Sequence, residues 1–421
     1  MKRSSPLLAW VLLYSCTLVF HNGKCCAGDW ASWFGPERNG HAAKDESLPS
    51  HFTATPTPDW KIKVGGGFSS PVVQGGELAY FDENGEREIL HLVSAKDGKE
   101  IWKLDVAEKI EDEWGAGPRS TPILTETRIY ATSGNGEFRC VERKTGKVIW
   151  QKSFEKDYQV KFLGSKAQEG TSSRRGNNGS PLLFDDKIVL PVGSTAGATL
   201  VCFNAENGTE IWRMGNEEAA YSSAIMGTVS GERQIIYLNA DALVGVLPAK
   251  GKEIWRVPLK TNAKRHASTP QLIGDMVIVS SHTFGVQTFH IKNIGSEWKI
   301  EKGWTNPEKI NLSTLVQVDN TLYGQGGNKN FVAINLATGK LLWSAPGFGK
   351  ENSSTIAVQQ RLISLTDEGI LYLLAANPEK YDELGQIQIC GKNWNFPAFA
   401  NQHLYVRDNR ELASYNLGNL K

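Results

Sequence analysis

A short motif that ends in tryptophan recurs along the chain at nearly constant spacing. Five clear copies are present: SAKDGKEIW (94–102), ERKTGKVIW (142–150), NAENGTEIW (204–212), PAKGKEIW (248–255) and NLATGKLLW (335–343). The last two tryptophans lie about two repeats apart, and a degenerate sixth copy, TFHIKNIGSEWKIEKGW (288–304), fills the gap with either Trp298 or Trp304. Self-similarity with a period of about 45 residues is typical of a repeat fold rather than of several independent domains.

The residues around each motif predict antiparallel β-structure. Each turn ends in glycine, as at Asp97-Gly98 and Asn207-Gly208, and glycine supplies the positive φ that tight hairpin turns need. An apolar strand precedes the turn, a short strand carrying the tryptophan follows it, and two more strands lie upstream, for example SPLLF (180–184) and KIVLPVG (187–193). Four strands in about 45 residues is the pattern of a β-propeller blade.

The strands predict an all-β, eight-bladed propeller of four-stranded antiparallel blades over residues 57–421. Six blades end near the motif tryptophans, and a seventh runs from SSTIAV (353–358) to QIQIC (386–390). The eighth starts at FPAFA (396–400), ends with ELASYNL (411–417) and lacks an outermost strand. The segment PDWKIKV (58–64) has the character of that missing strand. We expect it to pair with ELASYNL, which closes the ring and covers an exposed strand edge.

Residues 1–27 have the pattern of a secretory signal peptide. Lys2 and Arg3 precede an apolar run from Leu7 to Phe20, which is shorter than the roughly 18 residues of a spanning helix. Small residues suited to cleavage follow at Ala27-Gly28. An uncleaved anchor is the alternative, and the residues before the early cysteines fit a lipoprotein site poorly. The prediction is a periplasmic or secreted protein without a membrane span in its mature form.

Composition excludes one class of partner. The chain has 46 basic and 45 acidic side chains, a net charge of +1. Nucleic-acid binding rests mainly on an excess of basic charge, so we expect no nucleic-acid partner. The three cysteines beyond the signal, Cys140, Cys202 and Cys390, are too few and too scattered for a disulfide framework.

The motif A-x-[TDN]-G-K-x-x-W resembles the repeat of the pyrroloquinoline-quinone (PQQ)-like propeller superfamily, over nearly the whole chain after the signal. That superfamily includes quinoprotein alcohol dehydrogenases, the propeller lipoprotein of the outer-membrane barrel assembly machine and many secreted bacterial proteins. The segment WASWFGPERNG (30–40) resembles the W-x-x-x-G-P-x-x-N-G lead-in of the last group. The resemblance implies that residues 28–56 form an N-terminal strap packed on the propeller. It implies no single function, because a fold hosts many.

The dehydrogenase branch implies PQQ in the central channel, with calcium, a catalytic Asp and commonly a ring made by adjacent cysteines. The adjacent pair in this chain, Cys25-Cys26, lies in the predicted signal. Cys140 and Cys202 lie six residues before a turn glycine, where another copy has Ala333. That position favours small core residues over a redox role. We therefore expect no cofactor, with PQQ and calcium only if the chain is a dehydrogenase.

Other catalytic patterns are weak. No G-x-S-x-G nucleophile motif is present. The glycine run at 65–67 has no following Lys-Ser/Thr and predicts no phosphate loop. His266, His282 and His290 fall in one blade without metal-ligand spacing. The sequence therefore predicts no catalytic residue and no metal ligand.

The predicted mouth of the central channel is the best candidate site. Small hydroxyl residues open nearly every innermost strand, where they either pack structurally or face a ligand. Larger polar side chains lie just upstream, in loops that reach one rim of the channel from different sides. The candidate partner-binding residues are Trp114, Arg119, Arg174, Arg175 and Arg265. Arginine suits carboxylates or an acidic protein surface, and charges on solvated loops are the alternative.

We therefore predict a non-catalytic protein-binding or envelope-assembly scaffold. The alternative is a quinoprotein-type oxidoreductase, and a third reading is a glycan-binding module that uses Trp114. Protein partners in the cell envelope and a monomeric state are expected. Replacing Arg174 and Arg175 together by alanine is expected to weaken partner capture without unfolding the protein.

Overall fold

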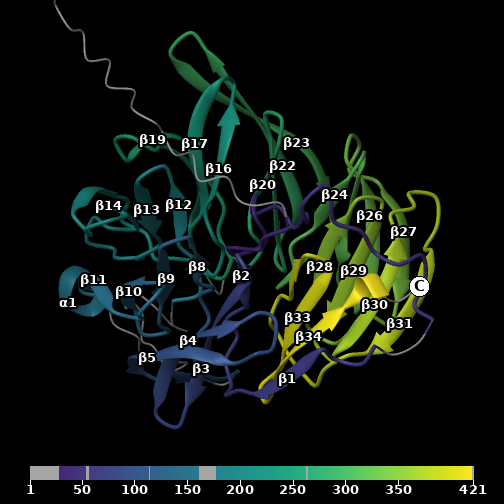
Figure 1. The fold of residues 1–421 in the computed structure, drawn as a ribbon. Helices are drawn as coiled ribbons and strands as arrows, with labels where there is room; N and C mark the ends of the chain where they lie inside the picture. Colours follow the sequence, from purple (N-terminus) through teal and green to yellow (C-terminus); the bar gives the residue numbers. More distant parts are fainter. Residues whose placement is uncertain (1–27, 54–55, 113, 161–176, 262–263, 420–421) are drawn as a thin grey trace, which may run out of the picture.

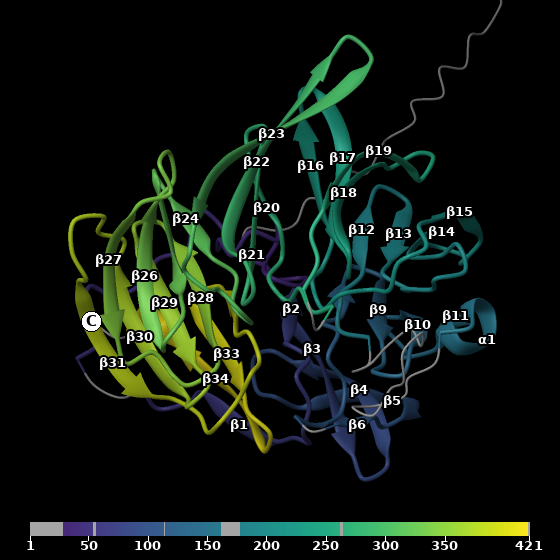
Figure 2. The same ribbon diagram turned by 180° about the vertical axis from the view of Figure 1, so that it is seen from behind.

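Eight antiparallel sheets of four strands each make up the computed structural model, which describes residues 28–53, 56–112, 114–160, 177–261 and 264–419. The colours in Figure 1 run round a ring of blades, so that the yellow last blade lies beside the blue first blade. Figure 2 shows the same ring from behind. The predicted all-β, eight-bladed propeller is confirmed.

The strands of each blade follow the chain from the innermost to the outermost position. Blade one is β2 (Val72–Gln74), β3 (Glu77–Asn84), β4 (Arg87–Ser94) and β5 (Glu100–Glu108), and blade two is β8 (Ile123–Leu124), β9 (Arg128–Thr132), β10 (Glu137–Glu142) and β11 (Val148–Ser153). Blade three is β12 (Leu182–Phe184), β13 (Lys187–Leu190), β14 (Leu200–Asn204) and β15 (Glu210–Met214), and blade four is β16 (Ile225–Val229), β17 (Glu232–Leu238), β18 (Ala242–Leu247) and β19 (Lys252–Pro258).

Blades five to seven repeat this order, and blade eight takes its fourth strand from the N-terminal side. Blade five is β20 (Gln271–Ile273), β21 (Met276–Ser281), β22 (Gly285–Ile294) and β23 (Glu297–Asn306), and blade six is β24 (Val316–Val318), β25 (Thr321–Gln325), β26 (Asn330–Asn335) and β27 (Leu341–Pro346). Blade seven is β28 (Ser353–Val358), β29 (Arg361–Thr366), β30 (Ile370–Ala375) and β31 (Glu383–Gln388), and blade eight is β32 (Ala398–Ala400), β33 (His403–Arg407), β34 (Glu411–Asn416) and β1 (Trp60–Lys63).

In the described parts of the chain, three small elements lie outside the blades. A two-stranded hairpin, β6 (Glu111–Asp112) and β7 (Gly115–Ala116), follows blade one. The helix α1 (Phe154–Tyr158) follows blade two, and the 3₁₀ helix η2 (Leu417–Asn419) follows blade eight. None of the helices formed by the described residues has the length and apolar character needed to cross a bilayer.

The motif tryptophans join neighbouring blades, as the repeat predicts. The indole N–H of Trp150 donates to the carbonyl of Ala205 in blade three (3.0 Å). Its ring packs on Gly208, where a Cβ would lie 2.5 Å from the indole. The φ of Gly208 is also positive, at 72°, so both backbone and space require glycine there. The same N–H bond to a carbonyl of the next blade recurs for Trp60, Trp102, Trp212, Trp304 and Trp343.

Blade five departs from the pattern because its outer hairpin is long. β22 and β23 have ten residues each and project beyond the ring in both views (Figures 1 and 2). The two-residue turn of this hairpin, between Ile294 and Glu297, lies at its far end, and Trp255 donates instead to the side chain of Gln234 in its own blade (2.6 Å). Of the two tryptophans considered for the sixth copy, Trp304 makes the contact with the next blade, to Leu336.

The ring is closed by the N-terminal strand. β1 pairs antiparallel with β34, with Trp60 opposite Ser414 and Lys63 opposite Glu411. Arg407 of β33 adds a second link because its buried guanidinium donates to carbonyls of blade one and of the segment before it. The acceptors are the oxygens of Phe81, Ser69 (3.2 Å), Gly65 (3.0 Å) and Gly66 (3.2 Å). The glycine run at 65–67 thus has a structural role.

The segment from residue 28 crosses one end of the channel. It bonds to the innermost strands of several blades: Trp30 with Val73, Ala31 with Leu124, Arg38 with Pro181 and Ala42 with Ala357. Trp33 enters the channel and donates to the Thr269 hydroxyl (2.9 Å). Figure 1 shows this purple segment passing across the middle of the ring. The strap therefore provides a floor for the channel.

The hydroxyl residues at the start of the innermost strands tie adjacent blades together. In each link a backbone N–H donates to a hydroxyl on the next blade: Ser70 to Thr121 (3.2 Å), Thr121 to Ser180 (2.9 Å), Ser180 to Ser223 (2.9 Å), Thr269 to Thr314 (3.1 Å) and Phe396 to Ser70 (3.0 Å). Of the two roles considered for these hydroxyls, the links support the structural one.

Buried Glu88 in β4 makes stability depend on pH. Its carboxylate accepts from the N–H groups of Gly134 (2.8 Å) and Ile110 (3.3 Å), and burial raises its pKa from 4.5 to about 7. Since the folded state holds this proton more tightly than the unfolded state, the contribution of Glu88 to stability falls as pH rises from 4.5 to 7. The loss is about 3 kcal/mol.

We expect Glu88→Gln to flatten this dependence. The melting temperature of the wild-type protein between pH 5 and pH 8 is compared with that of Glu88→Gln. Glu86→Gln, which replaces an exposed glutamate of the same hairpin, is the control and keeps the wild-type slope. An equal slope in Glu88→Gln and the wild-type protein would contradict the assignment.

Candidate functional site

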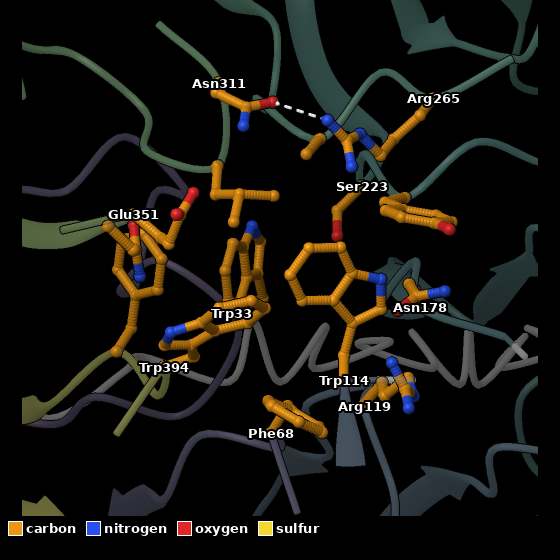
Figure 3. A pocket seen from close by; sticks show the side chains of 15 residues that line it. Trp33, Phe68, Trp114, Arg119, Asn178, Ser223, Arg265, Asn311, Glu351 and Trp394 are labelled. Carbon is orange, nitrogen blue, oxygen red and sulfur yellow. Dashed lines mark hydrogen bonds between the residues drawn. The ribbon is translucent and has the colours of Figure 1, made fainter. Parts of the chain in front are cut away.

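A pocket of about 170 Å³ opens at the channel mouth, above the floor made by the strap. Every blade contributes to it through the segment at the start of its innermost strand. The lining residues are Trp33, Phe68, Trp114, Arg119, Asn178, Tyr221, Ser223, Arg265, Ala267, Asn311, Leu312, Glu351, Asn352, Trp394 and Phe396. Figure 3 shows these side chains converging on one space. All eight blades therefore share this pocket.

Aromatic rings form much of the wall. The ring of Trp394 lies 5.3 Å from that of Trp114 and 5.7 Å from that of Phe68. Trp33 packs edge-on against Phe396, with centroids 4.7 Å apart. Trp114 is 42% exposed, although large aromatic side chains are usually buried. The rings offer apolar contact area that needs little further ordering.

Arg119 is engaged within the protein. Its guanidinium bonds to Asp112 (3.0 Å) and to the carbonyl of Gly115 (2.9 Å), and lies 4.8 Å from the centre of the Phe68 ring. The side chains of Arg119 and Asp112 are 7% and 0% exposed. Because Asp112 and Gly115 belong to β6 and β7, this pair fixes the hairpin that carries Trp114. Arg119 therefore orients the wall and has little of its charge left for a ligand.

Arg265 differs from Arg119 because its side chain bonds to a neutral group. Its Nη2 donates to the amide oxygen of Asn311 (3.2 Å), which is neutral, and its backbone N–H donates to Thr261. Its Nε is buried without a hydrogen-bond partner. No ion pair joins Arg265 to a carboxylate among the described residues. It is a half-buried cation that faces the pocket.

The structure brings together three of the five predicted site residues. Trp114 and Arg119 precede the innermost strand of blade two, Arg265 precedes that of blade five, and all three line the same pocket. Arg174 and Arg175 lie outside the described residues. Whether any of the five binds a partner stays a prediction.

The sequence prediction missed the aromatic lining. Phe68 and Trp394 lie directly upstream of an innermost strand, as the predicted arginines do. Their position in the repeat, just before an innermost strand, is the sequence signal that marks them as lining residues. Trp33 had no such signal, because it reaches the pocket from the strap.

The pocket fits PQQ and calcium poorly. Calcium takes about six to eight oxygen ligands, and Glu351 is the one carboxylate among the described lining residues. The amide oxygens of Asn311 and Asn352 already accept from Arg265 and Ser313. Pockets for drug-sized ligands usually measure about 300–1,000 Å³, and this pocket is smaller, at about 170 Å³.

The other candidate groups have structural surroundings. Burial raises the pKa of the Cys140 and Cys202 thiols to about 12, so neither is a thiolate nucleophile near neutral pH. His266 is buried and bonds to the carbonyl of Leu259 (3.0 Å). Within the described parts of the chain, no three His, Cys, Asp or Glu side chains form a group that could hold a metal ion.

Sequence comparison identifies related proteins. A family model described as outer membrane protein assembly factor BamB matches residues 85–189 and 196–377, which is more than half of the chain. BamB of Yersinia pestis is 24% identical over 323 residues, covering 73% of this chain and 75% of its own length. BamB of Shewanella oneidensis is 21% identical over 260 residues, or 58% of this chain and 60% of its own length.

Solved structures share the fold. BamB from Moraxella catarrhalis superposes with a TM-score of 0.59 at 13% identity, over 86% of this chain and 98% of that one. The computationally designed Ika8 protein gives 0.58 at 10% identity over 85% and 99%. Quinohemoprotein alcohol dehydrogenase ADHIIG from Pseudomonas putida HK5 gives 0.53 at 11% identity over 93% and 80%.

Such identities establish a common propeller and leave function open, whereas the family model matches the sequence itself. The predicted PQQ-like repeat is confirmed, and this chain belongs to the family described as outer membrane protein assembly factor BamB.

Proposed function

We propose that this protein is a non-catalytic scaffold of the cell envelope that binds polypeptide partners during outer-membrane protein assembly. Its relatives in Yersinia pestis and Shewanella oneidensis are named as assembly factors, which supports this role. The predicted signal peptide over residues 1–27 suits action in the periplasm.

The pocket at the channel mouth is the observation that carries the proposal. Its wall combines exposed Trp114 with the half-buried cation of Arg265, and aromatic and arginine side chains dominate the energetics of protein–protein interfaces. The Arg119–Asp112 pair holds the hairpin that carries Trp114, and a side chain that is already positioned loses less entropy when a partner binds.

The oxidoreductase alternative has less support. The described pocket offers one carboxylate, Glu351, and amide oxygens that are already bonded. Burial keeps the thiols of Cys140 and Cys202 protonated near neutral pH. A dialysis experiment with PQQ and calcium tests the alternative, since retention of one quinone per protein after gel filtration would favour an enzyme.

Partner capture tests the proposed function. Residues 28–421, immobilised through the C-terminus, are mixed with envelope extract of the source organism, and bound proteins are identified by mass spectrometry. We expect components of the outer-membrane assembly machinery to be enriched. The double change Trp114→Ala and Arg265→Gln is expected to lower their recovery at least fivefold, because it removes an aromatic contact and the unpaired charge.

A matched variant controls for general surface effects. Ile211→Ala with Arg213→Gln also removes one exposed apolar and one exposed basic side chain, both from β15 at the outer edge of blade three. It should capture partners at the wild-type level. Deleting the gene should also lower the amount of outer-membrane β-barrel proteins. Normal barrel levels together with no captured assembly component would refute the proposed function.

A further inference from the structure

Among the residues that the structure describes, one cation of the pocket wall has no carboxylate partner. Arg119, the other arginine of the wall, is paired with Asp112. Lys264, next to Arg265 in sequence, is paired with Glu218 (3.1 Å). Arg265 has the neutral Asn311 as its side-chain partner, and its Nε is buried with no acceptor. The Nε of Arg119 is buried without an acceptor as well, so what distinguishes Arg265 is that no carboxylate of the described residues pairs with it. A cation in the wall of a pocket favours an anionic ligand.

The surroundings of Arg265 limit the charge of that group. Glu351 lies on the side of the pocket opposite Arg265 in Figure 3. A dianion such as phosphate would face this carboxylate, and it would find one unpaired guanidinium where phosphate sites usually offer several donors. A singly charged carboxylate needs one guanidinium edge and is repelled less.

The other lining residues limit the kind of chemical group to which the carboxylate can be attached. Trp33, Phe68, Trp114 and Trp394 surround the space with ring surfaces (Figure 3). A flat or apolar group can cover these rings without leaving polar atoms unpaired. The volume of about 170 Å³ admits one side-chain-sized group rather than a long ligand.

The polar atoms of the wall disfavour a sugar. The hydroxyl of Ser223 accepts from the N–H of Ser180 (2.9 Å). The amide oxygen of Asn311 accepts from Arg265, and that of Asn352 accepts from Ser313 (3.0 Å). These three acceptors are thus already engaged, and a saccharide hydroxyl buried without an acceptor is unfavourable.

From this combination we infer that the pocket is a receptor for a single carboxylate on an apolar or aromatic body, presented by a polypeptide partner. Arg265 holds the carboxylate through charge-assisted hydrogen bonds, and Trp114 and Trp394 cover the apolar body. The polypeptide source rests on the proposed function, whereas the carboxylate chemistry rests on the pocket alone.

The test uses 4-phenylbutyrate as the probe and 4-phenylbutyramide as its uncharged match. Binding to residues 28–421 is followed by tryptophan fluorescence, because three tryptophans line the pocket, and by calorimetry. We expect saturable binding of the acid and at least tenfold weaker binding of the amide. Arg265→Gln should weaken binding of the acid at least tenfold and leave binding of the amide unchanged.

Control variants and competing ligands complete the test. Arg233→Gln removes an arginine that pairs with Asp185 outside the pocket, and it should bind the acid as the wild-type protein does. If Arg265→Gln does not fold, stabilisation of the wild-type protein against heat by the acid and not by the amide replaces it. Equal binding of acid and amide, or tighter binding of inorganic phosphate or N-acetylmuramate, would overturn the inference.

Competition separates this inference from the proposed function. Saturating 4-phenylbutyrate should lower capture of the assembly partner by the wild-type protein at least threefold. If the probe binds and capture is unchanged, the polypeptide source is wrong although the carboxylate site stands. If the probe does not bind, the proposed carboxylate site is wrong. The amount of outer-membrane β-barrel proteins in the deletion strain then still tests the proposed function independently.

Discussion

Replacement of Trp150 by alanine is expected to lower the free energy of unfolding by about 3–5 kcal/mol, the usual cost of deleting a large buried aromatic side chain. The indole is 8% exposed and packs between blades two and three, against Phe138 (5.0 Å) and Phe203 (5.9 Å). Its N–H bond to Ala205 is lost as well. The melting temperature and a urea titration measure the effect.

The neighbouring residue provides the control for Trp150. Ile149 is 40% exposed on the same strand, so Ile149→Ala should change stability by less than about 0.5 kcal/mol. Trp150→Phe, which keeps a ring but loses the N–H donor, should fall between the two. A Trp150→Ala protein as stable as Ile149→Ala would show that the contact between blades contributes little.

Deletion of residues 28–64 is expected to convert a soluble protein into one that aggregates. The deletion removes the strap and β1, so that β34 becomes an open edge with unpaired backbone groups, and open edges pair readily with other chains. It also uncovers core groups that Trp30 now covers. Gel filtration and light scattering measure the outcome, and a soluble truncation of wild-type stability would refute the closure.

A point change tests the same closure in the intact chain. Arg407→Met removes the guanidinium that links blade eight to the carbonyls of Phe81 and Gly66, leaving buried acceptors without donors. It should lower the melting temperature clearly. Arg361→Met, at a half-buried arginine of β29 that bonds to Leu48 at 3.3 Å, is the milder comparison.

The predictions made from the repeat succeed because nearly every blade repeats the same local contacts, between a turn glycine and the tryptophan of the preceding blade. Glycine at position 208 and tryptophan at position 150 are required by the turn and by the neighbouring blade. Both constraints recur at a fixed spacing, so the sequence pattern carries them. The closing strand at 58–64 could be predicted for a related reason, since the eighth blade has three strands and the chain offers one unused match.

The candidate site could be predicted only in part. The repeat places Trp114, Arg119 and Arg265 before innermost strands, which is enough to bring them to one rim. It does not show that Asp112 neutralises Arg119 while Arg265 stays unpaired, because neither charge partner follows the period of the repeat.

Residues 28–421 thus encode the number of blades, their order and the joint that closes them in short patterns along the chain, because these features depend on contacts within a blade or with the next one. The pocket depends on contacts across the ring. Trp33 reaches Thr269 over a separation of 236 residues, and Phe68 meets Trp394 from the first and last blades. Such contacts follow from the closed ring and from the strap that crosses it, and no local sequence pattern specifies them.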